Sequence, residues 1–478
     1  MAHPRDSNAP APGSRRAGLR WTVAIAVLSM AVAAAGAIDW RSPRREGAPR
    51  ILSAETRSGA LLAGAGRARV DLPDGAVLAG YRPFGREAGD DGRAIHARSL
   101  ILEVGGLRSA IVLVELMTLP PSLASRIDER VQAAGVGCSV IAATHTHSGP
   151  GGYDRALLPQ AVAVGRFDVE VEDAILDAVS ASLALARAEL APAELATGEG
   201  TLPFGRNRDR PGSPVDDRLT GVRLLRPDGA WVARIVRFAA HPTLEARAFG
   251  PAGDWPGAAM AALEEEGGVA LVLQGAVGDV RADLDAARDP GGEAARDAES
   301  FGGAVARATA ALGFHEVAAP VAMGCAAAEF DLPEADLDAM VPWPMGRLVS
   351  NLASVEAPGT SRISALRLDD LVLLAVPAEP TFGAARLAEE AVGRMGLRGR
   401  IVSLAQGYVG YAPLPEDVEA RVFSSRYSWF GSALVGRLTR GTEAAAAALL
   451  ARPAGERELS DRPDDTAAAD GSTGEHSR

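Results

Sequence analysis

Short apolar runs alternate with helical periodicities along most of this chain. Runs rich in β-forming apolar residues predict strands at 99–104, 110–114, 139–143, 231–238, 269–273 and 371–376. Between them, apolar residues recur every three to four positions, which predicts helices at 122–133, 171–186, 256–265, 304–312 and 383–392. The repeated order of strand and helix predicts an α/β fold, with a mixed sheet and flanking helices in a single large domain over residues 63–450. No internal repeat is visible in the sequence.

The two ends of the chain have a different pattern. Residues 1–38 begin with a polar, arginine-containing stretch, continue as an apolar run from Trp21 to about Ile38, and include the small residues Ala35-Gly36-Ala37. This order is typical of a secretory signal, close to the twin-arginine type, and the run is also just long enough for a membrane anchor. We therefore expect an exported protein, either periplasmic, extracellular or membrane-anchored. Residues 39–62 are predicted to be a linker, and residues 451–478 a disordered tail.

The composition excludes some classes of function. The net charge is -12, and all 49 basic residues are arginines, because the chain has no lysine. An acidic chain is a poor candidate for nucleic-acid binding, and a phosphate-binding P-loop requires a lysine. The two cysteines, Cys138 and Cys325, are too few for a metal cluster. They either pair once in an oxidising compartment or are two separate buried apolar residues.

Two of only seven histidines lie in one short segment. His145 and His147 follow an apolar strand and precede the breaker sequence Ser-Gly-Pro-Gly-Gly. Residues two apart in a strand project to the same face, and α/β proteins place their sites at strand ends. Two adjacent imidazoles indicate a shared metal or a proton relay. The alternative is a pair of polar histidines that cap a turn.

Other strands also end in residues that are able to bind a metal. His241, Asp279 and Glu379 each follow a predicted strand, and Tyr408 and Tyr411 come after a fourth apolar segment. Each residue alone has a structural explanation, since a carboxylate such as Glu379 also favours a helix N-terminus. Together they predict a metal site at one edge of the sheet. The G-x-S-x-G signature of serine α/β-hydrolases is absent from the sequence.

The segment His145 to Gly152, which reads H-T-H-S-G-P-G-G, resembles a motif of the neutral/alkaline (non-lysosomal) ceramidases at eight consecutive positions. Further blocks resemble that family in the same order over roughly residues 64–435. They are 65–71 with Gly80-Tyr81, Asn207-Arg208, His241-Pro242-Thr243 with Gly253-Asp254, Gly278-Asp279-Val280, 377–381 and 408–416.

The resemblance implies a catalytic domain with a bound Zn²⁺ ion. In that family, two histidines, a glutamate and a tyrosine hold the zinc, and these correspond here to His145, His241, Glu379 and either Tyr408 or, as we favour, Tyr411. It also implies hydrolysis of the amide bond of an N-acylated, ceramide-type lipid. His147 and Asp279 are the expected proton-shuttling residues, and Arg208 and Tyr411 are expected to stabilise the oxyanion.

The chain departs from the family pattern in ways that leave the substrate open. Arg281 stands where the family has a serine, and Val418 where it has a tyrosine. A permanent cation suits an acidic substrate, so the alternatives are a zinc hydrolase of another amide or ester, or a non-catalytic binding module. We expect a small-molecule substrate and a possible membrane surface as partners, and infer neither nucleic acid nor a protein partner.

One long segment without regular periodicity is predicted to be a functional loop. Residues 333–362 contain Met340, Trp343 and Met345. We expect this segment to form an apolar lip over the site.

Overall fold

The computed structural model describes residues 46–451 except 82–84, 90–91, 246–249, 290 and 342–344, together with residues 21, 27, 30, 31 and 44. The predicted signal and the predicted tail therefore lie almost entirely outside the described residues. Within the described part of the chain, no helix is both long and apolar enough to span a membrane.

Three five-stranded sheets with the same organisation make up the body of the protein. The first has the order β7 (Cys138–Ala143), β6 (Leu107–Val114), β5 (His96–Val104), β2 (Leu61–Arg69) and β8 (Ala191–Pro192). The second has the order β13 (Val269–Gln274), β12 (Trp231–Phe238), β11 (Arg218–Leu225), β9 (Glu194–Thr201) and β15 (Phe314–Glu316). The third has the order β20 (Arg398–Val402), β18 (Leu371–Ala375), β17 (Thr360–Leu368), β16 (Val321–Asp331) and β1 (Arg50–Gly59). In each sheet, one parallel pair adjoins antiparallel strands.

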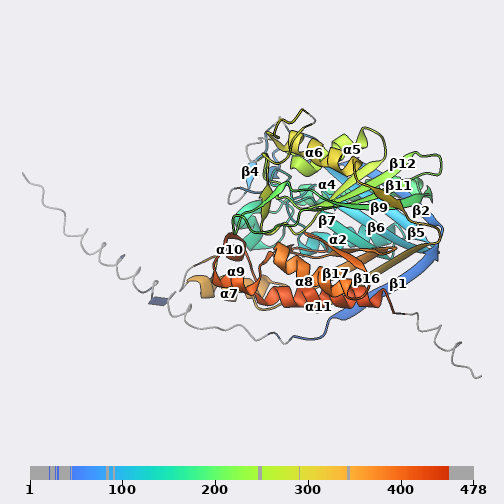
Figure 1. Cartoon of the computed structure of the whole chain (residues 1–478). Coiled ribbons are helices and arrows are strands. Elements are labelled where there is room, and N and C mark those ends of the chain that lie inside the picture. Colours follow the sequence, from blue (N-terminus) through green and yellow to red (C-terminus); the bar gives the residue numbers. More distant parts are fainter. Residues whose placement is uncertain are drawn as a thin grey trace, which may run out of the picture.

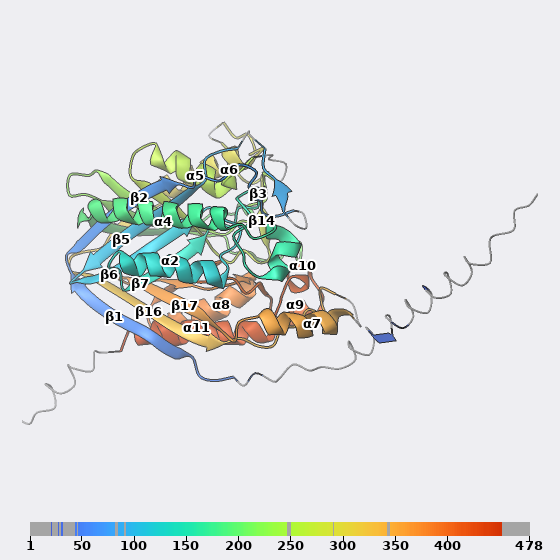
Figure 2. The ribbon, with the colours of Figure 1, turned by 180° about the vertical axis from the view of Figure 1, so that it is seen from behind.

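A helical crossover creates each parallel pair. The crossover helices are α2 (Pro121–Ala133), α5 (Asp254–Glu264) and α8 (Phe382–Gly393). A second helix follows each unit, namely α4 (Val169–Ala188), α6 (Ala298–Ala310) and α11 (Ala433–Ala448). Figure 1 shows α5 and α6 above the sheets and α8 and α11 below them, and Figure 2 shows α2 and α4 on the opposite side. The predicted α/β class and its mixed sheets are confirmed.

Burial explains why these elements were recognisable in the sequence. Every residue of β7 and of β18 is buried, as expected for strands covered on both faces. On α2, the buried residues Leu123, Ile127 and Val131 recur at intervals of four along one face. Asp168 begins α4, where its side chain accepts a hydrogen bond from the backbone N–H of Glu170.

Shorter elements complete the fold around the strand ends. Three two-stranded pairs are formed by β3 (Val77–Leu78) with β4 (Arg86–Glu87), β10 (Gly205–Asn207) with β14 (Val280–Ala282), and β19 (Glu379–Pro380) with β21 (Tyr411–Ala412). The short helices are α3 (Leu157–Pro159), η1 (Gln160–Val164), α7 (Met345–Glu356), α9 (Pro415–Glu419) and α10 (Phe423–Arg426).

Two predicted segments differ from the structure. The expected linker, 39–62, includes β1, which pairs with β16 from Arg50 to Gly59, and the start of β2. Most side chains of β1 are exposed, so backbone pairing holds this edge strand and no apolar pattern marked it. The expected loop, 333–362, contains the helix α7 and the start of β17.

The two cysteines form a disulfide between the first and third sheets. Cys138 begins β7 and Cys325 lies in β16, with their Cα atoms 6.2 Å apart. Of the two alternatives that the sequence left open, the structure shows the pair. Disulfides persist in oxidising compartments and are rare in the cytosol.

Candidate metal centre

The carboxyl ends of strands from all three sheets meet at one place. His145 follows β7, His241 follows β12, and Glu379 follows β18. The Nε2 atoms of His145 and His241 are 3.2 Å apart, and Glu379 Oε2 is 3.2 Å from His145 Nε2 and 3.9 Å from His241 Nδ1. Ligands about 2 Å from one zinc ion are themselves roughly 3–3.5 Å apart. The two separations of 3.2 Å, both from His145 Nε2, are compatible with one shared ion.

Backbone carbonyls fix the orientation of both imidazoles. His145 Nδ1 lies 2.7 Å from the carbonyl oxygen of Met117, and His241 Nδ1 lies 3.3 Å from that of Val277. A carbonyl accepts only, so each Nδ1 carries a proton, and the Nε2 atoms are the ones that face each other. Burial and then the charge of Arg208 lower the pKa of His241 well below its usual range, so this ring is neutral. Two converging imidazole nitrogens beside a carboxylate fit a bound cation.

His145 and His147 are brought together by a turn rather than by strand alternation. β7 ends at Ala143, and His145 has a φ of 70°, in the left-handed region. This φ is rare for a residue other than glycine and costs about 1 kcal/mol or more, and such strain concentrates at functional sites. The backbone N–H of His145 donates to the Leu116 carbonyl at 2.9 Å, which helps to hold the turn. The strand-face explanation inferred from sequence is therefore wrong, although the two ring centroids are 4.8 Å apart.

His147 completes a three-histidine cluster. The ligand nitrogens of His145, His147 and His241 all lie within 4.8 Å of one another. His147 Nε2 is buried and has no hydrogen-bond partner among the described residues. Burial, with the nearby His145, lowers the pKa of His147 to about 3, so this imidazole is neutral. Tyr81 lies beside it, with the two ring centroids 5.5 Å apart.

Two tyrosines and an arginine surround Glu379. Tyr408 donates a hydrogen bond of 2.7 Å to Glu379 Oε1. Tyr411 lies opposite Glu379 in the β19–β21 pair, and its hydroxyl accepts from Arg208 Nη2 at 2.8 Å. Burial alone would raise the pKa of Glu379, but His145 and Arg208 lower it to about 2. The carboxylate is therefore charged, and Tyr411 as the tyrosine ligand remains a prediction.

Arg208 is held in place on several sides. Its Nη2 also donates to the Gly278 carbonyl at 2.8 Å, and its guanidinium carbon lies 4.4 Å from the centre of the Phe423 ring. Its Nε is buried and without a hydrogen-bond partner in the described part of the chain. The Nε–H is therefore a buried donor without a partner among the described residues.

Asp279 contacts elements around the site rather than the histidine cluster. Its Oδ1 accepts from the backbone N–H of Phe382 at 2.9 Å, and its Oδ2 accepts from Asn207 Nδ2 at 3.0 Å. Asp279 thus links β10 and the N-terminus of α8, and its role in proton transfer stays a prediction. Arg281 lies on β14 opposite Arg206 with its side chain exposed, and its backbone forms a bridge with His241.

Some residues around the centre carried little signal in the sequence. Tyr81 belongs to a Gly-Tyr pair that resembles the family motif, but its place beside His147 depends on the fold. Phe423 gave no signal as a partner of Arg208. The carbonyls of Met117 and Val277 have no side-chain signature at all.

Gly278 is predicted to be intolerant of a side chain. A Cβ atom at this position would lie 2.6 Å from the Glu379 carbonyl oxygen and 2.8 Å from atoms of Pro380. We expect Gly278→Ala to lower the free energy of unfolding by about 1–3 kcal/mol and to weaken zinc binding by displacing Glu379. Urea unfolding and zinc titration measure both effects. Gly313→Ala, where a Cβ meets nothing within 4 Å, is the matched control. Equal behaviour of the two variants would contradict this prediction.

Asp279 is predicted to make stability dependent on pH. Burial raises the pKa of Asp279 from 3.8 to about 7. The folded chain therefore binds more protons than the unfolded chain between these values, and stability falls as pH rises. Between pH 5 and pH 7, we expect the free energy of unfolding of the wild type to fall by about 2 kcal/mol relative to that of Asp279→Asn. Urea midpoints at both pH values measure the difference, and a pH-independent difference would refute the prediction.

The three sheets and the strand-end cluster define an α/β protein with a histidine-based centre that is able to hold a metal ion. Residues 95–267 match the family model described as "Neutral/alkaline non-lysosomal ceramidase, N-terminal". The resemblance noted in the sequence is thereby confirmed.

Neutral ceramidases from other organisms are similar to this chain in sequence and in structure. The chain is 36% identical over 119 residues to the neutral ceramidase of Mycobacterium tuberculosis, which covers 22% of this chain and only 18% of that protein. It resembles the crystal structure of neutral ceramidase from Pseudomonas aeruginosa with a TM-score of 0.67, at 19% identity, over 82% of this chain and 75% of that one. A ceramidase complexed with C2 gives a TM-score of 0.69, at 20% identity, with the same coverage. These structures show that the chain has the neutral ceramidase fold.

Proposed function

We propose that this protein is a zinc-dependent hydrolase that cleaves the amide bond of an N-acylated, ceramide-type lipid. The observation that carries the proposal is the pair of imidazoles of His145 and His241, whose Nε2 atoms converge beside the Glu379 carboxylate. The family match supports the reaction class. The similar ceramidase solved with C2 supports the choice of substrate.

The residues present fit a zinc site. Glu379 Oε2 and His147 Nε2 are buried without hydrogen-bond partners among the described residues. Such atoms are expected where a cation and its bound water would supply the missing contacts. His145, His241, Glu379 and Tyr411 would hold the ion. Bound zinc supplies a water with a pKa of about 7 and polarises a carbonyl.

Two further residues are suited to transfer a proton and to stabilise negative charge during amide hydrolysis. Neutral His147, with its free Nε2, is suited to accept a proton from the attacking water and to deliver it to the leaving amine. Arg208, with an unpaired Nε–H, is suited to donate to the oxygen that becomes negative when the carbonyl is attacked.

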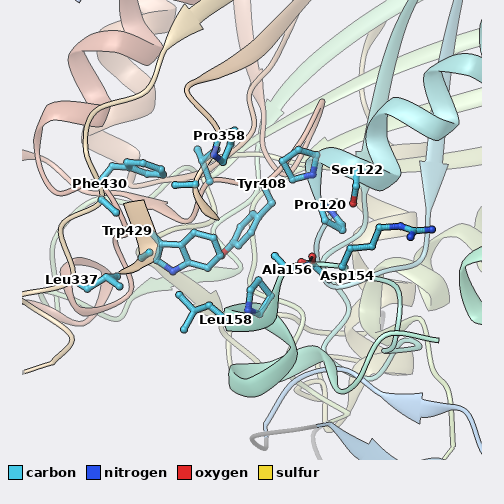
Figure 3. Close-up of a pocket in the computed structure, with 17 residues that line it drawn as sticks. Pro120, Ser122, Asp154, Ala156, Leu158, Leu337, Pro358, Tyr408, Trp429 and Phe430 are labelled. Carbon is cyan, nitrogen blue, oxygen red and sulfur yellow. Dashed lines mark hydrogen bonds between the residues drawn. The ribbon is translucent and has the colours of Figure 1, made fainter. Parts of the chain in front are cut away.

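An apolar cavity beside the centre supports a lipid substrate. The cavity has a volume of about 440 Å³, and Tyr408 forms part of its wall while its hydroxyl bonds to Glu379. Figure 3 shows the rings of Tyr408 and Trp429 side by side, with Leu158 and Leu337 near Trp429. Most lining side chains are aliphatic or aromatic, which suits a hydrocarbon chain.

The segment 333–362 contributes to this cavity through residues other than those expected. Its lining residues are Ala335, Leu337, Ala353, Ala357 and Pro358. Met340 and Met345 are not among the residues that line the cavity, and Trp343 lies outside the described residues.

Export is part of the proposal. The N-terminal pattern of charged, apolar and small residues supports it. The Cys138–Cys325 disulfide supports it as well, because an oxidising compartment favours such a bond.

A substrate panel tests the proposed reaction. Purified protein, stripped of metal with a chelator and then given zinc or magnesium, is assayed on ceramides of several chain lengths, N-acyl amino acids and simple esters. We expect ceramide cleavage that returns with zinc only. Turnover of esters or short amides, with no turnover of ceramide, would support a zinc hydrolase but contradict ceramide as its substrate. Protein that binds no zinc and turns over nothing would instead indicate a binding module.

Arg281→Ser in the same panel tests the departure from the family. If the exposed guanidinium favours acidic substrates, this variant shifts preference from N-acyl amino acids toward ceramide. An unchanged preference would show that Arg281 does not select the substrate.

A further inference from the structure

Helix α7 exposes an apolar stripe to solvent. Met345, Leu352 and Val355 are 42%, 57% and 79% exposed, and Leu348 is half-buried. The spacing of these four residues places them on one face of the helix. Gly346 and Ser350, on the opposite face, are buried. The apolar face is therefore turned outward, the reverse of an ordinary surface helix.

A second exposed apolar element lies across the cavity from α7. Leu157, in α3, is 68% exposed and Val162, in η1, is 46% exposed. Their neighbour Leu158 lines the apolar cavity described above, as do Ala353 of α7 and Ala357 just after it. The two exposed apolar elements thus flank the same cavity.

The chain that leads from the N-terminal apolar run is attached at the end of α7. The Arg44 guanidinium donates to the carbonyls of Ser354, Ala357 and Pro358, at 3.2, 3.1 and 2.6 Å. The apolar run of the sequence ends at about Ile38, six residues before Arg44. Six residues span at most roughly 20 Å. The C-terminal end of the run can therefore lie no farther than about 20 Å from Arg44 at the end of α7.

We propose that α7 together with α3 and η1 forms a docking surface for a lipid bilayer, against which the mouth of the apolar cavity is held. An amphipathic helix with an uncharged apolar face inserts into the boundary between headgroups and acyl chains. The N-terminal run has the length and composition to lie in the same bilayer, which favours a membrane over a protein partner. The use of the cavity by a lipid substrate rests on the proposed function, but docking itself requires neither zinc nor hydrolysis.

A local probe on the full chain tests the docking surface. Both native cysteines are paired, so a cysteine introduced as Val355→Cys can be labelled specifically with an environment-sensitive fluorophore. On addition of phosphatidylethanolamine–phosphatidylglycerol vesicles, we expect a blue shift and a several-fold gain in emission. The matched control is Leu387→Cys on α8, which is 46% exposed and is not among the residues that line the cavity. A response at position 355 no larger than that at position 387 would overturn the proposal.

Charged substitutions on the apolar stripe of α7 test whether bilayer docking supports turnover of a membrane-embedded substrate. Leu352→Asp with Val355→Asp is expected to lower turnover of vesicle-embedded substrate at least tenfold, with unchanged turnover of a soluble short-chain substrate. Leu387→Asp is expected to change neither rate. If the double variant instead dissociates an oligomer in sedimentation experiments, the stripe joins copies of the chain and the bilayer proposal is wrong. The fluorophore at position 355 is expected to respond in the same way when His145→Ala is also present. Docking can therefore be tested even if the proposed zinc-dependent hydrolysis is wrong.

Discussion

Replacing His145 with alanine is expected to abolish zinc binding and to reduce turnover at least about 10³-fold. Its Nε2 lies within 3.2 Å of both His241 Nε2 and Glu379 Oε2, so its removal deletes one corner of the ligand set. Metal polarisation of a carbonyl contributes several kcal/mol to a hydrolytic barrier, and about 4 kcal/mol corresponds to a factor of 10³. Metal analysis of the purified variant and steady-state kinetics measure the two effects.

His315→Ala is the control for this variant. His315 is exposed on β15, in the strand at the far edge of the second sheet, and we expect this variant to keep both zinc and turnover. Circular dichroism distinguishes loss of the site from loss of the fold. Full activity of zinc-free His145→Ala would remove the basis of the proposed mechanism.

The strands that the sequence predicted are those that burial marks most strongly. β7 and β18 are covered on both faces and appear as uninterrupted apolar runs. β1 was missed because its side chains are mostly exposed and form no apolar pattern. β16 was missed although it is mostly buried, because it is rich in alanine and glycine, which are weak strand signals. The similar order of the three sheets was also not visible, because topology depends on pairing between distant segments rather than on local sequence.

Site residues were predictable from the sequence where a metal-binding residue type directly follows an apolar strand. His145, His241 and Glu379 met that condition, and the structure brings them together. The left-handed turn at His145 was not predictable, because histidine has no strong preference for that conformation. The apolar cavity was only partly foreseen, since α7 contributes only the small Ala353 to its wall while Met345, Leu352 and Val355 of the same helix are exposed to solvent.

Replacing Arg208 with alanine is expected to lower kcat by about 10²–10³-fold while zinc remains bound. Loss of one donor to a developing oxyanion typically costs about 2.7–4 kcal/mol. Arg208 offers an unpaired buried Nε–H, and its contacts with Tyr411, Gly278 and Phe423 fix where that donor points. Because the expected contact forms in the transition state, KM should change little.

Two further variants separate the role of the donor from the role of its charge. Arg208→Lys keeps the charge but has a compact ammonium in place of the planar fork, so it cannot bind Tyr411 and the substrate oxygen together, and we expect it to recover less than about tenfold of the lost rate. Arg206→Ala removes a neighbouring arginine whose exposed side chain pairs with Asp283 and Asp285, and its kcat should stay near the wild-type value. Loss of zinc in Arg208→Ala would show that this residue supports the ligand set through Tyr411. Wild-type kcat in the same variant would show that groups other than Arg208 stabilise the oxyanion.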